Sequence, residues 1–350
     1  MKIIAINNRI KSVDAIRILA IFAVIVIHTV PFASKLNPVG VELNLATILT
    51  QLARFAVPFF FVISGYFWAG KIISTAALKR VTISMSIRII TIFLFWSSVY
   101  LIQTNIVQAM DHSLIYSIKI IYWDVVGILR SPYLFFLQGT KSHLWFLSSL
   151  LTSLLISFLL ISLGMIRSLF LLALVLYIIG LMGKAYTDTP IGFATQFNFR
   201  NGPFFGLIFF VSGYLLKSKT PNSSWMPYGL VLAALGIFLH FSEIIFINKL
   251  YGTTMNQDYL FGTFFFGIGV SLIALSNSRY LNIKGLTFIG PLILGVYAVH
   301  FIFVDLLRPL SDEMSGSPAW EICYPILVFF LSVLAAATLS RNRVTRLFVA

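Results

Sequence analysis

Long apolar runs dominate the chain, and their length is the first guide to its fold. An apolar helix of about 17–25 residues crosses a bilayer. Ten runs of about this length occur, at residues 13–33, 48–68, 83–104, 143–163, 167–184, 202–217, 226–247, 259–276, 286–307 and 320–340. The pattern predicts an all-α, polytopic membrane protein with about ten transmembrane helices. It also predicts one domain over residues 1–350, with a core at about 10–340 and no separate soluble domain.

Residues 105–142 do not fit this pattern. The segment is apolar, but Lys119 and Asp124 interrupt it. As an eleventh span it would invert every later loop. We therefore expect an aromatic-rich segment that lies on, or dips into, the extracytoplasmic face of the membrane.

The distribution of charge orients the chain. The sequence is 59% hydrophobic and 10% charged, yet its net charge is +14. Loops on one predicted side hold fourteen Lys or Arg residues and no acid, whereas loops on the other side hold eight bases and eight acids. The positive-inside rule therefore places both termini in the cytoplasm. Since the basic charge is explained by orientation, nucleic-acid binding has no support. The single cysteine, Cys323, excludes an internal disulfide and a cysteine metal cluster.

The first apolar run carries three ionisable residues on one side. Arg17 and His28 are eleven residues apart, which on a helix is three turns plus about 20° and a rise of about 16 Å. Asp14 lies one turn before Arg17 on the same face. A charge in hydrocarbon costs about 3 kcal/mol or more, so this face must contact protein, water or ligand. A polar packing seam, or residues that merely mark the membrane edge, is the alternative.

Further polar residues fall into two layers along the spans. The predicted outer layer contains His28, Arg54, His143, Trp145, His240, Glu243, His300 and Asp305, and the predicted cytoplasmic layer contains Arg17, Lys79, Arg80 and Arg88. Structural explanations remain open: His240 and Glu243 could satisfy each other, Trp145 could be an interfacial residue, and Lys79 and Arg80 could only orient the chain. No spacing of His, Cys and Asp indicates a metal site.

The two layers suit a ligand that reaches across the membrane. A cationic cluster binds phosphates, and a histidine can remove a hydroxyl proton near neutral pH. An acyl thioester of coenzyme A has this shape, with phosphates at one end and a reactive carbonyl at the end of a thin arm. A proton-coupled transporter could use the same residue types.

Five motifs in order along the chain resemble the integral-membrane acyltransferase-3 family. They are the Arg17 and His28 pair, Val57-Pro-Phe-Phe-Phe-Val-Ile-Ser-Gly-Tyr66, the basic run from Lys79 and Arg80 to Arg88, His143-Leu-Trp-Phe146 and Gly295-Val-Tyr-Ala-Val-His300. The resemblance is greatest to the subgroup that includes the enterobacterial common antigen O-acetyltransferase. It implies transfer of acetyl from cytoplasmic acetyl-CoA, a co-substrate rather than a bound cofactor. The implied acceptor is a hydroxyl of a cell-surface polysaccharide, such as O-antigen, or of a lipid-linked glycan precursor, and the implied location is the bacterial inner membrane.

The resemblance also implies roles for individual residues. His28 and Arg17 are expected to be essential, His28 as base or transient acyl carrier and Arg17 as a contact to the donor. Donor binding is expected from Arg80, Arg88, Lys79, Ser64, Gly65 and Tyr66, and acceptor binding from His143 and Trp145, with the indole stacking on a sugar. The alternatives are a transporter of polysaccharide or lipid-linked sugar without acyl-transfer chemistry, and a structural partner in an envelope complex.

Overall fold

A computed structural model describes residues 10–33, 38–72, 74–109, 114–219, 221–282 and 288–349. In this part of the chain the regular structure is helical, apart from one isolated bridge between Val39 and Glu42. The predicted all-α class is therefore confirmed.

Thirteen α-helices and several short 3-10 helices follow one another along the described ranges. The α-helices are α1 (Lys11–Thr29), α2 (Leu45–Leu52), α3 (Ala56–Ala69), α4 (Thr75–Ala109), α5 (Leu114–Arg130), α6 (Pro132–Gln138), α7 (Trp145–Ser162), α8 (Ile166–Met182), α9 (Pro203–Leu216), α10 (Trp225–Tyr251), α11 (Phe261–Leu275), α12 (Ile293–Glu313) and α13 (Pro318–Arg341). The 3-10 helices are η1 (Ala53–Phe55), η2 (Ser142–Leu144), η3 (Arg279–Leu281), η5 (Gly290–Leu292) and η6 (Thr345–Phe348).

Seven described segments are long and apolar enough to cross a membrane, so this is a multi-pass membrane protein. They are Lys11–Thr29, Leu45–Ala69, Thr75–Gln103, Ser142–Ser162, Trp225–Tyr251, Gly290–Glu313 and Pro318–Arg341. Three shorter apolar helices, α8, α9 and α11, coincide with three further predicted runs. The count of ten crossings, and the side on which the termini lie, remain predictions.

The segment that did not fit the pattern forms a bent pair of helices. α5 and α6 meet at 101° around Ser131, and the pair could form an eighth span. Pro132 begins α6, where its missing N–H costs the helix nothing. We expected this segment to lie on or in the membrane face, and its sharp bend is compatible with a helix that enters and returns.

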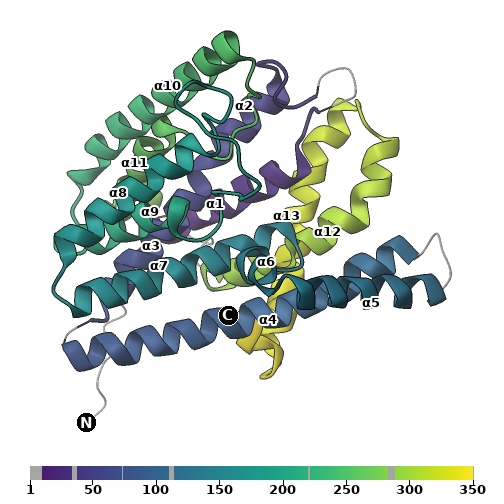
Figure 1. The fold of residues 1–350 in the computed structure, drawn as a ribbon, viewed down its shortest axis with the longest axis horizontal. Helices are drawn as coiled ribbons and strands as arrows, with labels where there is room; N and C mark the ends of the chain where they lie inside the picture. Colours follow the sequence, from purple (N-terminus) through teal and green to yellow (C-terminus); the bar gives the residue numbers. More distant parts are fainter. Residues whose placement is uncertain are drawn as a thin grey trace.

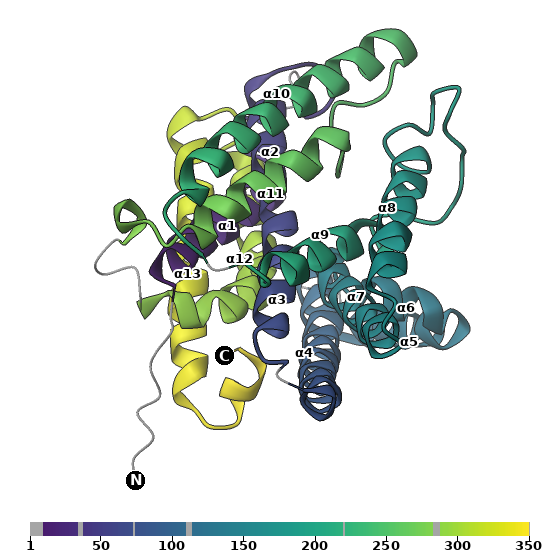
Figure 2. The ribbon, with the colours of Figure 1, turned by 90° about the vertical axis from the view of Figure 1, so that its left-hand side faces the viewer.

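The helices surround a central crossing of α3 and α9. α4, the longest helix, runs along one edge of the bundle, and α10 and α11 pack together near the opposite edge (Figure 1). Turned by 90°, the bundle shows α3 and α9 between α1, α12 and α13 on one side and α4 and α7 on the other (Figure 2). His28, near the end of α1, contacts His300 in the middle of α12, and it lines the same cavity as Trp145 at the start of α7.

Small residues allow the central crossing. A Cβ on Gly65 of α3 would lie 2.0 Å from the carbonyl oxygen of Phe210 on α9, and a Cβ on Gly213 of α9 would lie 1.9 Å from that of Val62 on α3. Both distances are far below van der Waals contact, so the two backbones approach this closely only because each helix offers a glycine.

Candidate active site

A cavity of about 900 Å³ lies between α1, α3, α4, α7 and α12. Arg17 and His28 both line it, as the helical periodicity predicted. Five other predicted site residues line the same cavity: Ser64, Arg80, Arg88, His143 and Trp145. The structure thus brings the two predicted layers together as two ends of one space.

Five cationic side chains from four parts of the chain line the cavity and are here called the basic end, after Arg17, which lies about 16 Å along α1 from His28. They are Arg17, Lys71, Arg80, Arg88 and Arg346. Arg17 forms an ion pair of 3.4 Å with Asp14, and its guanidinium carbon lies 5.2 Å from the centre of the Phe67 ring. Such an end attracts anions, phosphates above all.

Arg346 is a cavity residue that sequence reasoning missed. Trp96 on α4 donates its indole N–H to the carbonyl oxygen of Phe348 at 3.0 Å, and the Phe348 ring stacks on Phe95 at 3.8 Å. These contacts hold η6 against α4 and place Arg346 at the cavity. Its only signal in the sequence was a positive charge shortly after the last apolar helix.

The other end of the cavity, here called the histidine end, brings together three histidines from distant parts of the chain. They are His28 in α1, His143 in η2 just before α7, and His300 in α12. The ring centres of His28 and His300 are 5.4 Å apart, and those of His143 and His300 are 5.0 Å apart. Phe301 contacts all three rings, at 4.6–5.3 Å between centres. His28 and His143 line the cavity, whereas His300 is fully buried behind them.

The ring nitrogens of the buried histidines are poorly satisfied by the protein. Neither nitrogen of His143 has a hydrogen-bond partner in the described part of the chain, and neither does Nε2 of His300. Since unpaired buried polar atoms cost free energy, they indicate a site built for a ligand or water. Within the described ranges, no group of three His, Cys, Asp or Glu side chains is arranged to hold a metal ion.

Trp145 lies beside the histidine end but is almost completely enclosed. It is 7% exposed, and its ring packs against Phe61 and Phe205. The guanidinium carbon of Arg200 lies 4.9 Å from its ring centre. A cation therefore already covers one face of the indole on which we expected a sugar to stack.

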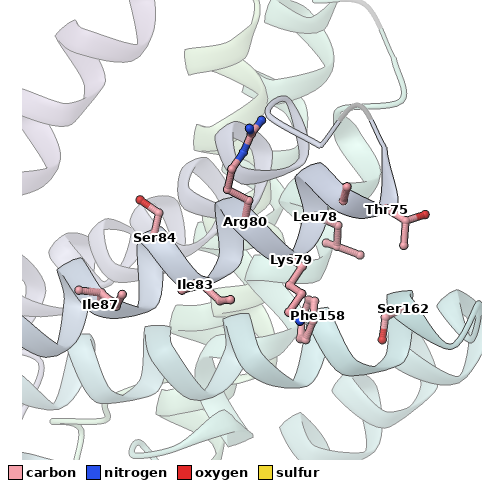
Figure 3. Close-up of a pocket in the computed structure, with 10 residues that line it drawn as sticks. Thr75, Leu78, Lys79, Arg80, Ile83, Ser84, Ile87, Phe158 and Ser162 are labelled. Atoms are coloured by element: carbon pink, nitrogen blue, oxygen red, sulfur yellow. The ribbon is translucent and has the colours of Figure 1, made fainter.

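Lys79 lies outside the cavity that Arg80 lines. It faces a groove of about 900 Å³ between α4 and α7 and points toward Phe158, whereas Arg80 and Ser84 project from the other side of α4 (Figure 3). Arg80 and Ser84 line the groove and the central cavity alike. Lys79 and Arg80 thus share the groove, but of these two neighbouring cations only Arg80 also lines the central cavity.

The three consecutive residues expected along the donor path separate in the same way. Ser64 lines the cavity, while Gly65 faces the backbone of α9. Tyr66 is buried and packs against Lys217, whose ammonium lies 4.7 Å from the ring centre. Only Ser64 of the three faces the proposed path.

The remaining predicted polar residues are paired away from the cavity. His240 shares hydrogen bonds with Gln51 and Thr263 at 2.9 and 3.0 Å, and not with Glu243. Glu243 instead accepts from the backbone N–H groups of Phe261 and Gly262, at the start of α11, and from the Tyr186 hydroxyl. The suggested pairing of His240 with Glu243 is therefore wrong, and a structural role fits both residues.

Asp305 and Arg54 form ion pairs near the histidine end. The Asp305 carboxylate lies 2.5 Å from the Lys141 ammonium, whose nitrogen is 5.1 Å from the centre of the Phe301 ring. Arg54 contacts Asp258 at 3.1 Å. Sequence spacing alone gave no sign of either partner, since 164 and 204 residues separate them.

Comparison with known proteins places the chain in a family. The family described as "Acyltransferase domain", acyltransferase-3, matches residues 10–341. A serine/alanine racemase from Enterococcus gallinarum is 30% identical over 264 residues, 72% of this chain and 33% of that protein. Two amino-acid racemases from Enterococcus faecalis are 30% and 26% identical over 62% and 79% of this chain.

The chain matches only about a third of the length of these curated relatives. No solved structure matches it. The family match spans nearly the whole chain and includes Arg17, His28 and His143 of the cavity, whereas Arg346 follows the matched residues. This protein belongs to the acyltransferase-3 family of membrane acyltransferases.

Proposed function

We propose that this protein transfers an acetyl group from acetyl-CoA to a hydroxyl of a cell-surface polysaccharide or lipid-linked glycan, at a bacterial inner membrane. The observation that carries the proposal is the single cavity with a basic end and a histidine end. Arg17 and His28 mark the two ends on one helix, about 16 Å apart along its axis. An acyl-CoA has its phosphates and its thioester at opposite ends of the flexible pantetheine arm.

The basic end would bind the phosphates of the donor. Arg80, Arg88, Arg346 and Lys71 are exposed side chains on the cavity wall, so they are accessible to a ligand. Arginine is suited to this task because its planar fork contacts two phosphate oxygens at once.

The histidine end would carry out the transfer. His28 removes the proton of the acceptor hydroxyl as its oxygen attacks the thioester carbonyl. The new ester bond forms as the C–S bond breaks, and the coenzyme A thiolate leaves and takes up a proton. Ser64 and the apolar wall from α4 would line the path of the arm between the two ends.

The racemase names belong to relatives of which this chain matches about a third, so they add no acceptor to the proposal. Transport of a glycan without acyl transfer is the main competing function. Acyl transfer leaves the acetyl group covalently bound to the glycan, whereas transport leaves the glycan unmodified.

The test uses purified protein in lipid nanodiscs, acetyl-CoA labelled in its acetyl group, and isolated envelope glycans. We expect label in the glycan with the parent protein and none above background with His28→Ala, while that variant still binds coenzyme A. His240→Gln is the matched control, since His240 is buried at a similar predicted depth but does not line the cavity. Near-normal turnover by His28→Ala would remove this residue from the chemistry, and absence of label in every glycan would favour transport.

A further inference from the structure

Three cations surround one carboxylate beside the histidine end. Arg54 and Arg200 each place a guanidinium nitrogen near the same oxygen of Asp258, at 3.1 and 3.4 Å. Lys184 lies 3.1 Å from the other oxygen. In the described part of the chain no other acid pairs with these three cations, so two positive charges are left over.

The acid of this cluster stays ionised. Burial raises the pKa of Asp258, but the opposing charges of the surrounding cations outweigh that effect and hold it below the usual range of an aspartate. Asp258 therefore already contributes its full negative charge, and the excess of cations persists at neutral pH.

The cluster also has unused hydrogen-bond donors. The Nε–H groups of Arg54 and Arg200 are buried and have no partner among the described residues. The side chains of Arg54 and Asp258 are only 11% and 15% exposed, so solvent reaches this charge poorly. A partly buried excess of positive charge with unpaired donors is stabilised by an anion that accepts from the arginine forks.

The position of the cluster relates it to the cavity. Arg54 comes from η1, Lys184 and Arg200 from the loop between α8 and α9, and Asp258 from the loop before α11. The Arg200 guanidinium covers the Trp145 ring, and Trp145 lines the cavity together with His28 and His143. An anion in this cluster would thus sit next to the proposed site of transfer, and not at the basic end.

We propose that Arg54, Lys184 and Arg200 form a binding site for an oxyanion, a phosphate or a carboxylate, that belongs to the acyl acceptor. The identity of the ligand as part of the acceptor rests on the proposed function, whereas the anion site itself does not. The assignment implies an acidic acceptor, whose negative group binds here while its hydroxyl lies at the histidine end.

The experiment measures thermal stabilisation by anions in phosphatidylcholine nanodiscs. Inorganic phosphate, glucuronate and coenzyme A are titrated separately at constant ionic strength. The chains are the parent, Arg54→Gln, Arg200→Gln and, to remove a cation from the basic end, Arg88→Gln. Arg308→Gln is the matched control, because Arg308 is a more exposed arginine whose neighbouring acid is Asp305.

We expect the phosphate or glucuronate concentration for half-maximal stabilisation to rise about tenfold or more in Arg54→Gln and Arg200→Gln, and to stay unchanged in Arg308→Gln. The coenzyme A response should stay unchanged in Arg200→Gln and weaken in Arg88→Gln. Each single neutralisation leaves Asp258 two cationic partners, so folding should persist. If a glutamine variant nevertheless misfolds, Arg200→Lys keeps the charge and removes only the planar fork, and it should still weaken the response.

Equal phosphate and glucuronate responses in all chains would overturn the anion site. An Arg200-dependent stabilisation that appears only when phosphatidylglycerol is added to the nanodiscs would assign the cluster to a lipid headgroup and overturn its link to the acceptor. A missing coenzyme A response in every chain would instead count against the proposed function and leave the result for the anion site standing.

Discussion

The three clustered histidines are not equivalent, because their ring nitrogens are held differently. Nδ1 of His300 lies 2.7 Å from the carbonyl oxygen of Tyr297. A carbonyl can only accept, so Nδ1 carries a proton, and in the neutral ring Nε2 keeps its lone pair. His300 is therefore suited to orient its neighbours from behind the cavity wall. His28, half-buried on that wall, is the histidine we assign to proton transfer.

Two cations on one helix allow the donor assignment to be tested at single residues. Arg88 lines the cavity, whereas Lys79 faces the groove beside α7. We expect Arg88→Ala to raise the acetyl-CoA concentration needed for half-maximal transfer about tenfold or more, since one charge-assisted contact contributes roughly 1.5–3 kcal/mol. Lys79→Ala should change it little.

Donor titrations at saturating acceptor measure this difference. Equal effects of both substitutions would mean that general positive charge, and not the cavity, determines donor binding. A loss confined to acceptor affinity would reverse the assignment of the two ends.

At the scale of helices, the α3 and α9 crossing is the tightest constraint near the cavity. Ser64 faces the cavity and the adjacent Gly65 touches the backbone of α9, so the position of one fixes the other. The basic end depends on α4 in a similar way, since Trp96 and Phe95 of α4 hold η6 and thereby Arg346. The site is thus positioned by helix contacts more than by loops.

Gly65→Ala tests this constraint. The new Cβ would lie 2.0 Å from the Phe210 carbonyl oxygen, a rigid backbone atom, so α3 and α9 must move apart. We expect a loss of stability of about 1–3 kcal/mol or more, seen as a lower melting temperature, together with reduced transfer.

Gly127→Ala in α5 is the matched control, because nothing lies within 4 Å of the added methyl group. It should leave melting unchanged or raise it slightly, since alanine favours a helix by about 1 kcal/mol over glycine. Similar melting of both variants would show that the crossing tolerates more separation than its geometry indicates.

At the scale of the whole molecule, the sequence predicts well what depends on local periodicity. Each of the ten apolar runs overlaps a helix, because bilayer thickness sets helix length. Arg17 and His28 share a face because helical geometry alone decides it. Ser64, Gly65 and Tyr66 could not all line one path, since consecutive helical residues diverge by about 100°.

Local periodicity in the sequence does not predict contacts between distant segments of the chain. Asp258 and its three cations come from three separate parts of the chain, and nothing in their spacing points to one another. Arg346 likewise reaches the cavity only through the packing of η6 on α4. Both depend on how helices pack, which periodicity does not specify.

The predicted orientation can be tested by cysteine labelling in a Cys323→Ser background. We expect an impermeant maleimide to label Ser142→Cys from outside intact cells and to label Ser218→Cys only after permeabilisation, as the positive-inside rule requires. Ser113, also within the predicted outer segment 105–142, lies outside the described residues. The reverse labelling pattern would overturn the orientation and exchange the sides assigned to donor and acceptor.

The close approach of α3 and α9 limits how this sequence can diverge. Pro58-Phe-Phe-Phe-Val-Ile-Ser-Gly-Tyr66 and Phe209-Phe-Val-Ser-Gly-Tyr214 look like two copies of one motif, and their glycines meet the opposite backbone reciprocally. If α3 and α9 moved apart to accommodate a larger residue in place of one glycine, the position of the other glycine would also have room for a side chain. Gly65 and Gly213 should therefore be substituted together or not at all. The contact that they share can explain why the two motifs are alike, without any duplication of the chain.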